Sequence, residues 1–271
     1  MNTQRVDYNF NASALGIGGY FVRGGKKVLV PSLASVALAP DGGEGWTSLT
    51  NYEEDGISFT RAESRVSGYE TSRSFFTTRS DIHITNLSLF GKINVGQLQA
   101  TVTSTRDLDD SDTDEAKFQL HASFFGVDVD GAGVVPRIDI DVCEATYKEL
   151  LDRTIRSVEA ESGVAAAESQ VTALRRGEPI RSTMLHGIDH DDKPNMIKEA
   201  KNVLKVPGFA KIHFGELLVK RGRRRVNLLR IEFGNFWEDD HRKGLIASQH
   251  DSGSVTIASA DGNGEPVWPR N

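Results

Sequence analysis

The sequence predicts a mainly β protein, an antiparallel β-sandwich or distorted barrel with one or two inserted α-helices. Three observations favour this class. Apolar and polar residues alternate through most of the chain, glycine makes up 26 of 271 residues, and a helical period occurs in only one region, at about 144–176. Alternation is typical of half-buried strands, and frequent glycine is typical of many turns. We therefore expect one β-rich domain over residues 1–271 with a helical insertion at 144–176, the alternative being a domain boundary at about 177–200.

The longest run with a strand period covers residues 74–105. Its apolar residues occupy every second position, but the alternation slips by one residue at Thr85-Asn86 and again at Gly96-Gln97. A slip of one residue would turn the apolar face outward unless the backbone bends or bulges there. The run therefore predicts strands that bend at these two places.

The N-terminal part of the chain predicts three extended segments. Residues 6–14 alternate cleanly, and the glycine-rich stretch Gly16–Gly19 that ends this strand permits a turn or a bulge. Residues 27–39 form a second apolar run, which Pro31 confines to an edge strand or a bend. Residues 57–71 show a mixed period and are expected to be extended.

The middle of the chain changes from a strand period to a helical one. Residues 117–142 alternate and contain Asp130-Gly131, a typical hairpin turn. Apolar residues at helical spacing then predict an amphipathic helix over 144–161, and a second helix follows at 164–176. Residues 176–195 are polar and are expected to form a loop.

The final third returns to a strand period and ends in a stretch rich in glycine and proline, which we expect to be irregular. The expected elements are strands at 203–206, 211–219, 226–233 and 254–260 and an irregular tail at 261–271.

Composition excludes several classes of protein. The formal net charge of −6 argues against a general nucleic-acid binder, which needs a basic face to meet phosphates. No signal peptide and no membrane span can be read in the sequence, so we expect a cytoplasmic protein. The lone cysteine, Cys143, excludes an internal disulfide and is expected to be a small buried hydrophobe, the alternative being a nucleophile at a helix N-terminus.

A basic cluster lies between two expected strands, at Lys220, Arg221, Arg223, Arg224 and Arg225. Gly222 can supply a hairpin turn, and guanidinium groups at a hairpin tip can grip phosphate or carboxylate with two hydrogen bonds. The cluster is therefore a candidate contact for an anion or a protein partner, the alternative being charges that are solvated or paired with carboxylates of this chain. Outside the cluster, Glu216 and Arg230 lie at similar positions of the same hairpin and are expected to pair across it.

Two weak metal signatures occur. Asp110, Asp112 and Asp114 have the spacing of the first ligands of a calcium loop, but neither the glycine nor the bidentate glutamate of that loop follows. His186 and His190 lie four residues apart in an expected polar loop, without the glutamate of a zinc-protease motif. We expect no cofactor, with calcium at the acidic loop as the alternative.

Three tryptophans, Trp46, Trp237 and Trp268, lie in polar, loop-like surroundings. An exposed indole can stack on a sugar or anchor a protein partner, and otherwise it covers the open end of a sheet. These residues are candidate aromatic contacts.

No catalytic motif stands out, and the predicted function is that of a non-enzymatic structural or interaction protein. We expect it to self-associate, or to bind another protein, through the edges or surfaces of its sheets. Two alternatives stay open: a glycan- or anion-binding module that uses the basic hairpin and the tryptophans, and an enzyme of unrecognised type.

Overall fold

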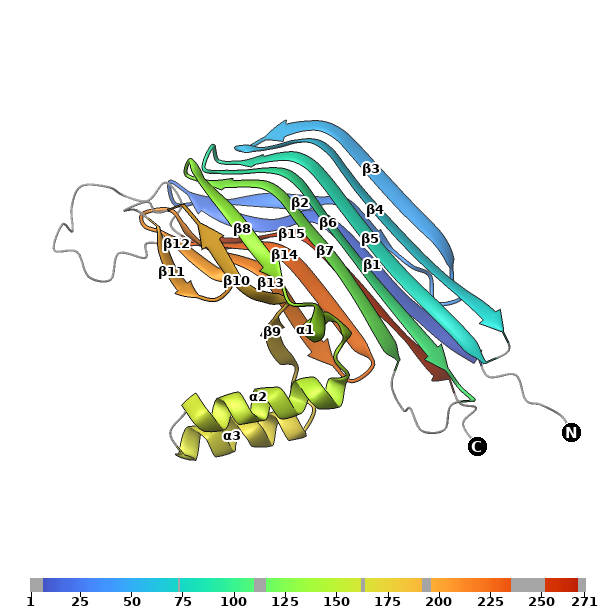
Figure 1. The fold of residues 1–271 in the computed structure, drawn as a ribbon. Coiled ribbons are helices and arrows are strands. Elements are labelled where there is room, and N and C mark those ends of the chain that lie inside the picture. Colours follow the sequence, from blue (N-terminus) through green and yellow to red (C-terminus); the bar gives the residue numbers. More distant parts are fainter. Residues whose placement is uncertain are drawn as a thin grey trace, which may run out of the picture.

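A computed structural model describes residues 7–72, 74–109, 116–161, 164–191, 196–234 and 252–267. Two antiparallel sheets of long strands lie face to face, and a pair of helices extends away from one end (Figure 1). The predicted β-sandwich with inserted helices is therefore confirmed.

The first sheet contains seven strands in the order β10-β8-β7-β6-β5-β4-β3, so that, apart from β10, each strand pairs with its neighbours in sequence. Consecutive long strands joined by tight turns suit the alternating sequence. The strands are β3 (Gly43–Glu54), β4 (Ile57–Ser72), β5 (Phe75–Leu89), β6 (Ile93–Asp107), β7 (Lys117–Val129), β8 (Ala132–Ile138) and β10 (Leu185–His190).

The second sheet contains eight strands in the order β11-β12-β13-β14-β15-β1-β2, with β9 also paired to β13. β1 and β15, the first and last strands along the chain, pair with each other inside this sheet, next to the edge strand β2. The strands are β1 (Asp7–Arg23), β2 (Lys26–Ala37), β9 (Ile180–Thr183), β11 (Ile197–Ala200), β12 (Val203–Val206), β13 (Ala210–Lys220), β14 (Arg223–Phe233) and β15 (Gly253–Val267).

The helices are α1 (Ile140–Glu144), α2 (Tyr147–Glu161) and α3 (Val164–Arg175). The expected strand up to residue 142 ends earlier, because the Asp139 side chain accepts a hydrogen bond from the Val142 amide and caps α1. A second cap begins α2, where the hydroxyl of Thr146 accepts from the Glu149 amide and the Glu149 carboxylate accepts from the Thr146 amide. The two predicted helices are confirmed as α2 and α3, and α1 is an additional short helix where the end of a strand was expected.

The first sheet bends along a line that crosses its strands (Figure 1). Asn51, Asn86 and Gly126, on alternate strands, have φ angles of 52°, 52° and 61°. Asn86 lies opposite Gly96, where the pairing passes from Thr85–Gln97 to Leu87–Val95. The two predicted bends are thus confirmed as one feature. Asparagine and glycine tolerate the left-handed conformation that the bend requires.

The second sheet bends in the same way and in the same sense. Ala34, Gly215 and Ala258 have φ angles of 47°, 56° and 52° on β2, β13 and β15. At the bend of the second sheet, two consecutive residues of β14, Leu228 and Leu229, both face the core. At the bend of the first sheet the opposite holds, and two consecutive residues, such as those at 60–61, both face solvent. The first sheet therefore lies on the convex side of a bent sandwich and the second on the concave side.

The core fills the space between the sheets. From the concave sheet come Ile17, Phe21 and Phe214, and from the convex sheet come Ile84 and Leu98, all fully buried. Full burial of such side chains contributes roughly 1.5–3 kcal/mol each, and this burial holds the two sheets together.

Two regions that were expected to be irregular form strands. The expected loop at 176–195 contains β9, which pairs with β13 of one sheet, and β10, which pairs with β8 of the other. The expected irregular tail continues as β15 up to Val267, because its glycines and polar residues pair along β1 and β14. Backbone pairing along the two neighbouring strands satisfies the amide and carbonyl groups of this stretch despite its weak strand propensity.

Candidate functional site

The basic cluster forms the turn of the β13–β14 hairpin, as predicted, with Gly222 at a φ of 68°. Its arginines, however, do not all project from the tip. Asp261 of β15 has a side chain only 3% exposed and lies between Arg223 and Arg225. The Nε atom of Arg223 lies 3.0 Å from both Asp261 carboxylate oxygens, and Nη2 of Arg225 lies 2.9 Å from Oδ2.

Arg224 points the opposite way, into the interior. Its residue is 2% exposed, its guanidinium carbon lies 4.6 Å from the centre of the Phe118 ring, and its Nη1 donates to the Lys220 carbonyl at 2.9 Å. Lys220 and Arg221 are exposed, and the side chains of Arg223 and Arg225 are 36% and 42% exposed while they hold Asp261. The three consecutive arginines thus hold the hairpin against β15 and β7.

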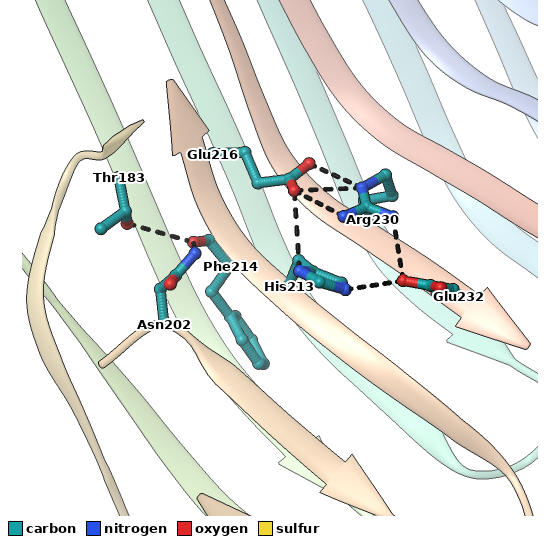
Figure 2. A network of polar contacts seen from close by, with 7 residues as sticks. All are labelled: Thr183, Asn202, His213, Phe214, Glu216, Arg230 and Glu232. Carbon is teal, nitrogen blue, oxygen red and sulfur yellow. Dashed lines mark hydrogen bonds and ion pairs between the residues drawn. The ribbon is translucent and has the colours of Figure 1, made fainter. Parts of the chain in front are cut away.

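A second polar network lies farther along the same two strands, on the concave face (Figure 2). Both carboxylate oxygens of Glu216 accept hydrogen bonds from Arg230, the shortest at 2.7 Å, which confirms the predicted cross-strand pair. His213 lies 3.2 Å from Glu232 and 3.6 Å from Glu216. Burial disfavours ionisation of Glu216, but the hydrogen bonds and charge of Arg230 outweigh it and lower the pKa of this carboxyl. Burial and the charge of Arg230 lower the pKa of His213.

These shifts predict a loss of stability in acid. Unfolded His213 takes up a proton near its ordinary pKa of 6.5, whereas the folded side chain, with a lower pKa, does not. At pH values between the folded and the unfolded pKa of this histidine, the unfolded state binds more protons. The free energy of unfolding should therefore decrease as the pH is lowered, by up to about 1.4 kcal/mol per pH unit. A His213→Gln variant should show a shallower fall below pH 6.5 in urea titrations; an unchanged slope would contradict the assignment.

The candidate metal sites are not assembled in the described part of the chain. His186 and His190 lie on β10, a strand and not a loop, where positions four apart are about 13 Å apart and cannot share one ion. His186 lies 3.3 Å from Asp139, the cap of α1. The described residues contain no group of three metal-binding side chains. Asp110, Asp112 and Asp114 lie outside the described residues, so calcium binding there stays a prediction.

Cys143 is buried in α1, as expected for a small hydrophobe. Burial, with the charges of Asp139 and Glu144, raises the pKa of its thiol to about 11. A thiol with this pKa is protonated near neutral pH, which is the wrong state for a nucleophile.

Trp46 stands on β3, a strand, and not in the expected loop; Trp237 and Trp268 lie outside the described residues. Trp46 is 70% exposed and lies beside a hollow of 390 Å³ on the convex face. The hollow spans four neighbouring strands, and its polar lining includes Arg65, Arg79, Asp81, His83 and Gln99. Register brings these residues together, since Arg65 is paired with both Trp46 and Asp81, and His83 with Gln99.

Sequence reasoning found Trp46 but missed the rest of this hollow. The other residues come from three strands, and each occupies an ordinary outward position of an alternating run. The one signal in the sequence is the kind of residue at the outward positions of 61–83. Several of these positions carry arginine, aspartate or histidine, although serine or threonine would suit a solvent-facing strand position equally well. Without the strand register, nothing placed them beside Trp46.

The edge of β3 is a second candidate surface. β3 is the last strand of the convex sheet, and all 12 of its residues are at least partly exposed. A terminal strand points alternate backbone amides and carbonyls away from its only neighbour, so these groups can pair with another strand.

These features define the class of protein as a bent, two-sheet antiparallel β-sandwich with a projecting helical hairpin. The chain belongs to the family described as Domain of unknown function (DUF8256), which matches residues 8–181. The matched part contains β3 and the Trp46 hollow but not the basic hairpin. No curated protein and no solved structure matches the chain. Within the described ranges, no helix has the length and apolar character needed to cross a membrane.

Proposed function

We propose that this chain is a non-enzymatic structural or interaction protein that self-associates through the edge of β3. The observation that carries the proposal is a contrast among the four terminal strands of the two sheets. β2 carries Lys26, Lys27 and Pro31, features that discourage edge pairing. β10 and β11 are only 6 and 4 residues long. β3 is long and has neither lysine nor proline.

The composition of β3 suits pairing with a second copy. Residues 45–52 carry no charge and include a tryptophan, two threonines and a tyrosine, which favour strands. The strand bends at Asn51, so the straight part before it, Gly43–Thr50, is the part that can continue the sheet. Glu44 is its only charged residue, and an antiparallel pair about a two-fold axis need not place the two copies of Glu44 opposite each other.

Self-association is tested by adding charge to this edge. Ser48→Lys with Thr50→Lys places two like charges per chain on outward positions of β3, and we expect the dissociation constant to rise at least about tenfold, because the added lysines repel across the interface. Sedimentation velocity at micromolar concentrations measures the effect.

The matched control places the same two charges on an interior strand of the same sheet. Asn94→Lys with Gln97→Lys modifies solvent-facing positions of β6, where each residue is paired with β5 on one side and β7 on the other, and should associate like the unmodified protein. The proposal would be contradicted if the unmodified protein is monomeric at these concentrations. It would also be contradicted if the two double variants have the same dissociation constant.

A further inference from the structure

The hollow beside Trp46 has the shape and surface of a small ligand site. Its 390 Å³ lies within the range of about 300–1,000 Å³ that ligand pockets occupy. The Trp46 indole forms part of its wall and is 70% exposed. An exposed indole next to planar polar groups offers a flat apolar surface and hydrogen bonds at the same place.

Two carboxylates and two guanidinium groups line the hollow, and neither carboxylate is paired with Arg65. Arg61 pairs with Glu63 at 2.5 Å, and Arg79 holds Asp81 with two hydrogen bonds, of 2.8 and 2.7 Å. Both carboxylates at this site therefore already have a cation. Arg65 is exposed and has no ion pair or hydrogen bond among the described residues. The hollow thus keeps one guanidinium available to an anion, directly across from Trp46 in the register.

A histidine that lines the hollow also has a buried polar atom without a partner. The Nε2 atom of His83 is buried and has no hydrogen-bond partner within the described ranges. Leaving such an atom unsatisfied costs about 1–3 kcal/mol in a folded protein, so structures usually provide a partner. His83 lines the hollow, so a rotation of its ring would let a hydroxyl group that enters the hollow serve as that partner, with Gln99 on the adjacent strand as a further donor and acceptor.

We propose that this hollow binds an acidic saccharide, with a pyranose ring lying on Trp46 and its carboxylate held by Arg65. The aliphatic face of the ring matches the apolar indole, and a carboxylate matches the two parallel donors of a guanidinium. Hydroxyl groups of the sugar meet Asp81, His83 and Gln99. A neutral sugar would leave Arg65 without its anion, and a small inorganic anion would leave Trp46 uncovered.

The saccharide site lies within one protomer and goes beyond the proposed self-association. It is tested by calorimetric titration of the unmodified protein with an oligogalacturonate hexasaccharide and with maltohexaose, a neutral hexasaccharide. We expect the acidic ligand to bind at least about tenfold more tightly than the neutral one, and its affinity to fall with added salt. Equal affinity for the two ligands, or no binding of either at millimolar concentration, would overturn the proposal.

Variants locate the binding to the hollow. Trp46→Ala and Arg65→Ala should each weaken oligogalacturonate binding at least about tenfold, while Trp46→Tyr, which keeps a flat ring, should retain most of it. The controls are Phe125→Ala, which removes an aromatic 72% exposed on the same sheet, and Arg137→Ala on β8. An equal loss in the controls would overturn the location. Because sedimentation reports association separately, a monomeric protein that binds the acidic ligand contradicts only the proposed function.

Discussion

We expect the Arg223→Ala, Arg225→Ala double variant to lose about 3 kcal/mol of its free energy of unfolding. Asp261 is 3% exposed at its side chain, and these two arginines are the cations that the structure places on it. Without them the carboxylate, on a strand that lies between β14 and β1, loses both of the cations that it is paired with. An uncompensated buried charge is among the few defects that cost this much in a single site.

The measurement is urea denaturation followed by circular dichroism, with Lys220→Ala as the control. Lys220 lies in the same turn and is exposed, so its removal should change the free energy by less than about 0.5 kcal/mol. A double variant as stable as the unmodified protein would show that the Asp261 pairs contribute little. That result would favour the role that was predicted for the hairpin arginines from the sequence, a contact for an anion or a protein partner.

We expect Gly19→Ala to cost at least about 3 kcal/mol, enough to leave the protein largely insoluble or unfolded. Gly19 has a φ of 143°, and a Cβ atom there would lie 2.2 Å from the Ser254 carbonyl oxygen of the neighbouring strand. That oxygen belongs to the backbone and cannot move aside unless β1 and β15 separate. These two strands pair with each other over almost their whole length inside the concave sheet.

The matched control is Gly24→Ala in the turn between β1 and β2. Its φ of 55° is also left-handed, but a Cβ atom there meets nothing within 4 Å. The control should therefore cost only the backbone strain, about 1 kcal/mol. Thermal and urea denaturation of both variants separate the two contributions. Equal costs at the two positions would mean that close approach of the strands is not what requires glycine at position 19.

The glycines near Gly19 show which features of a strand can be predicted from neighbouring residues alone. The stretch was predicted to end the first strand in a turn or a bulge, and the structure has a bulge at 17–19 inside a strand that continues to Arg23. The bends at Asn86 and Gly96 were predicted more fully, because there the apolar alternation itself changed phase. A phase change is visible in the sequence, whereas the continuation of a strand through glycines depends on its neighbours.

The candidate sites likewise divide into those that could be predicted from the sequence and those that could not. The Glu216–Arg230 pair was predicted because both residues lie on one hairpin. Asp261, which holds Arg223 and Arg225, was not predicted, because it follows them by more than 30 residues on a stretch that was expected to be irregular. The Trp46 hollow was not predicted either, since its residues come from four strands and meet only through their register.

The sequence by itself determined the mainly β class, most strands and their turns, the helical insertion and the bends of the convex sheet, because each depends on residues close together in the chain. Only the tertiary structure decided which strand lies at the edge, which arginines are paired and what surrounds Trp46. These depend on which strands become neighbours and in what register. Many pairings satisfy the same alternating pattern, and the packing of the whole core selects one of them.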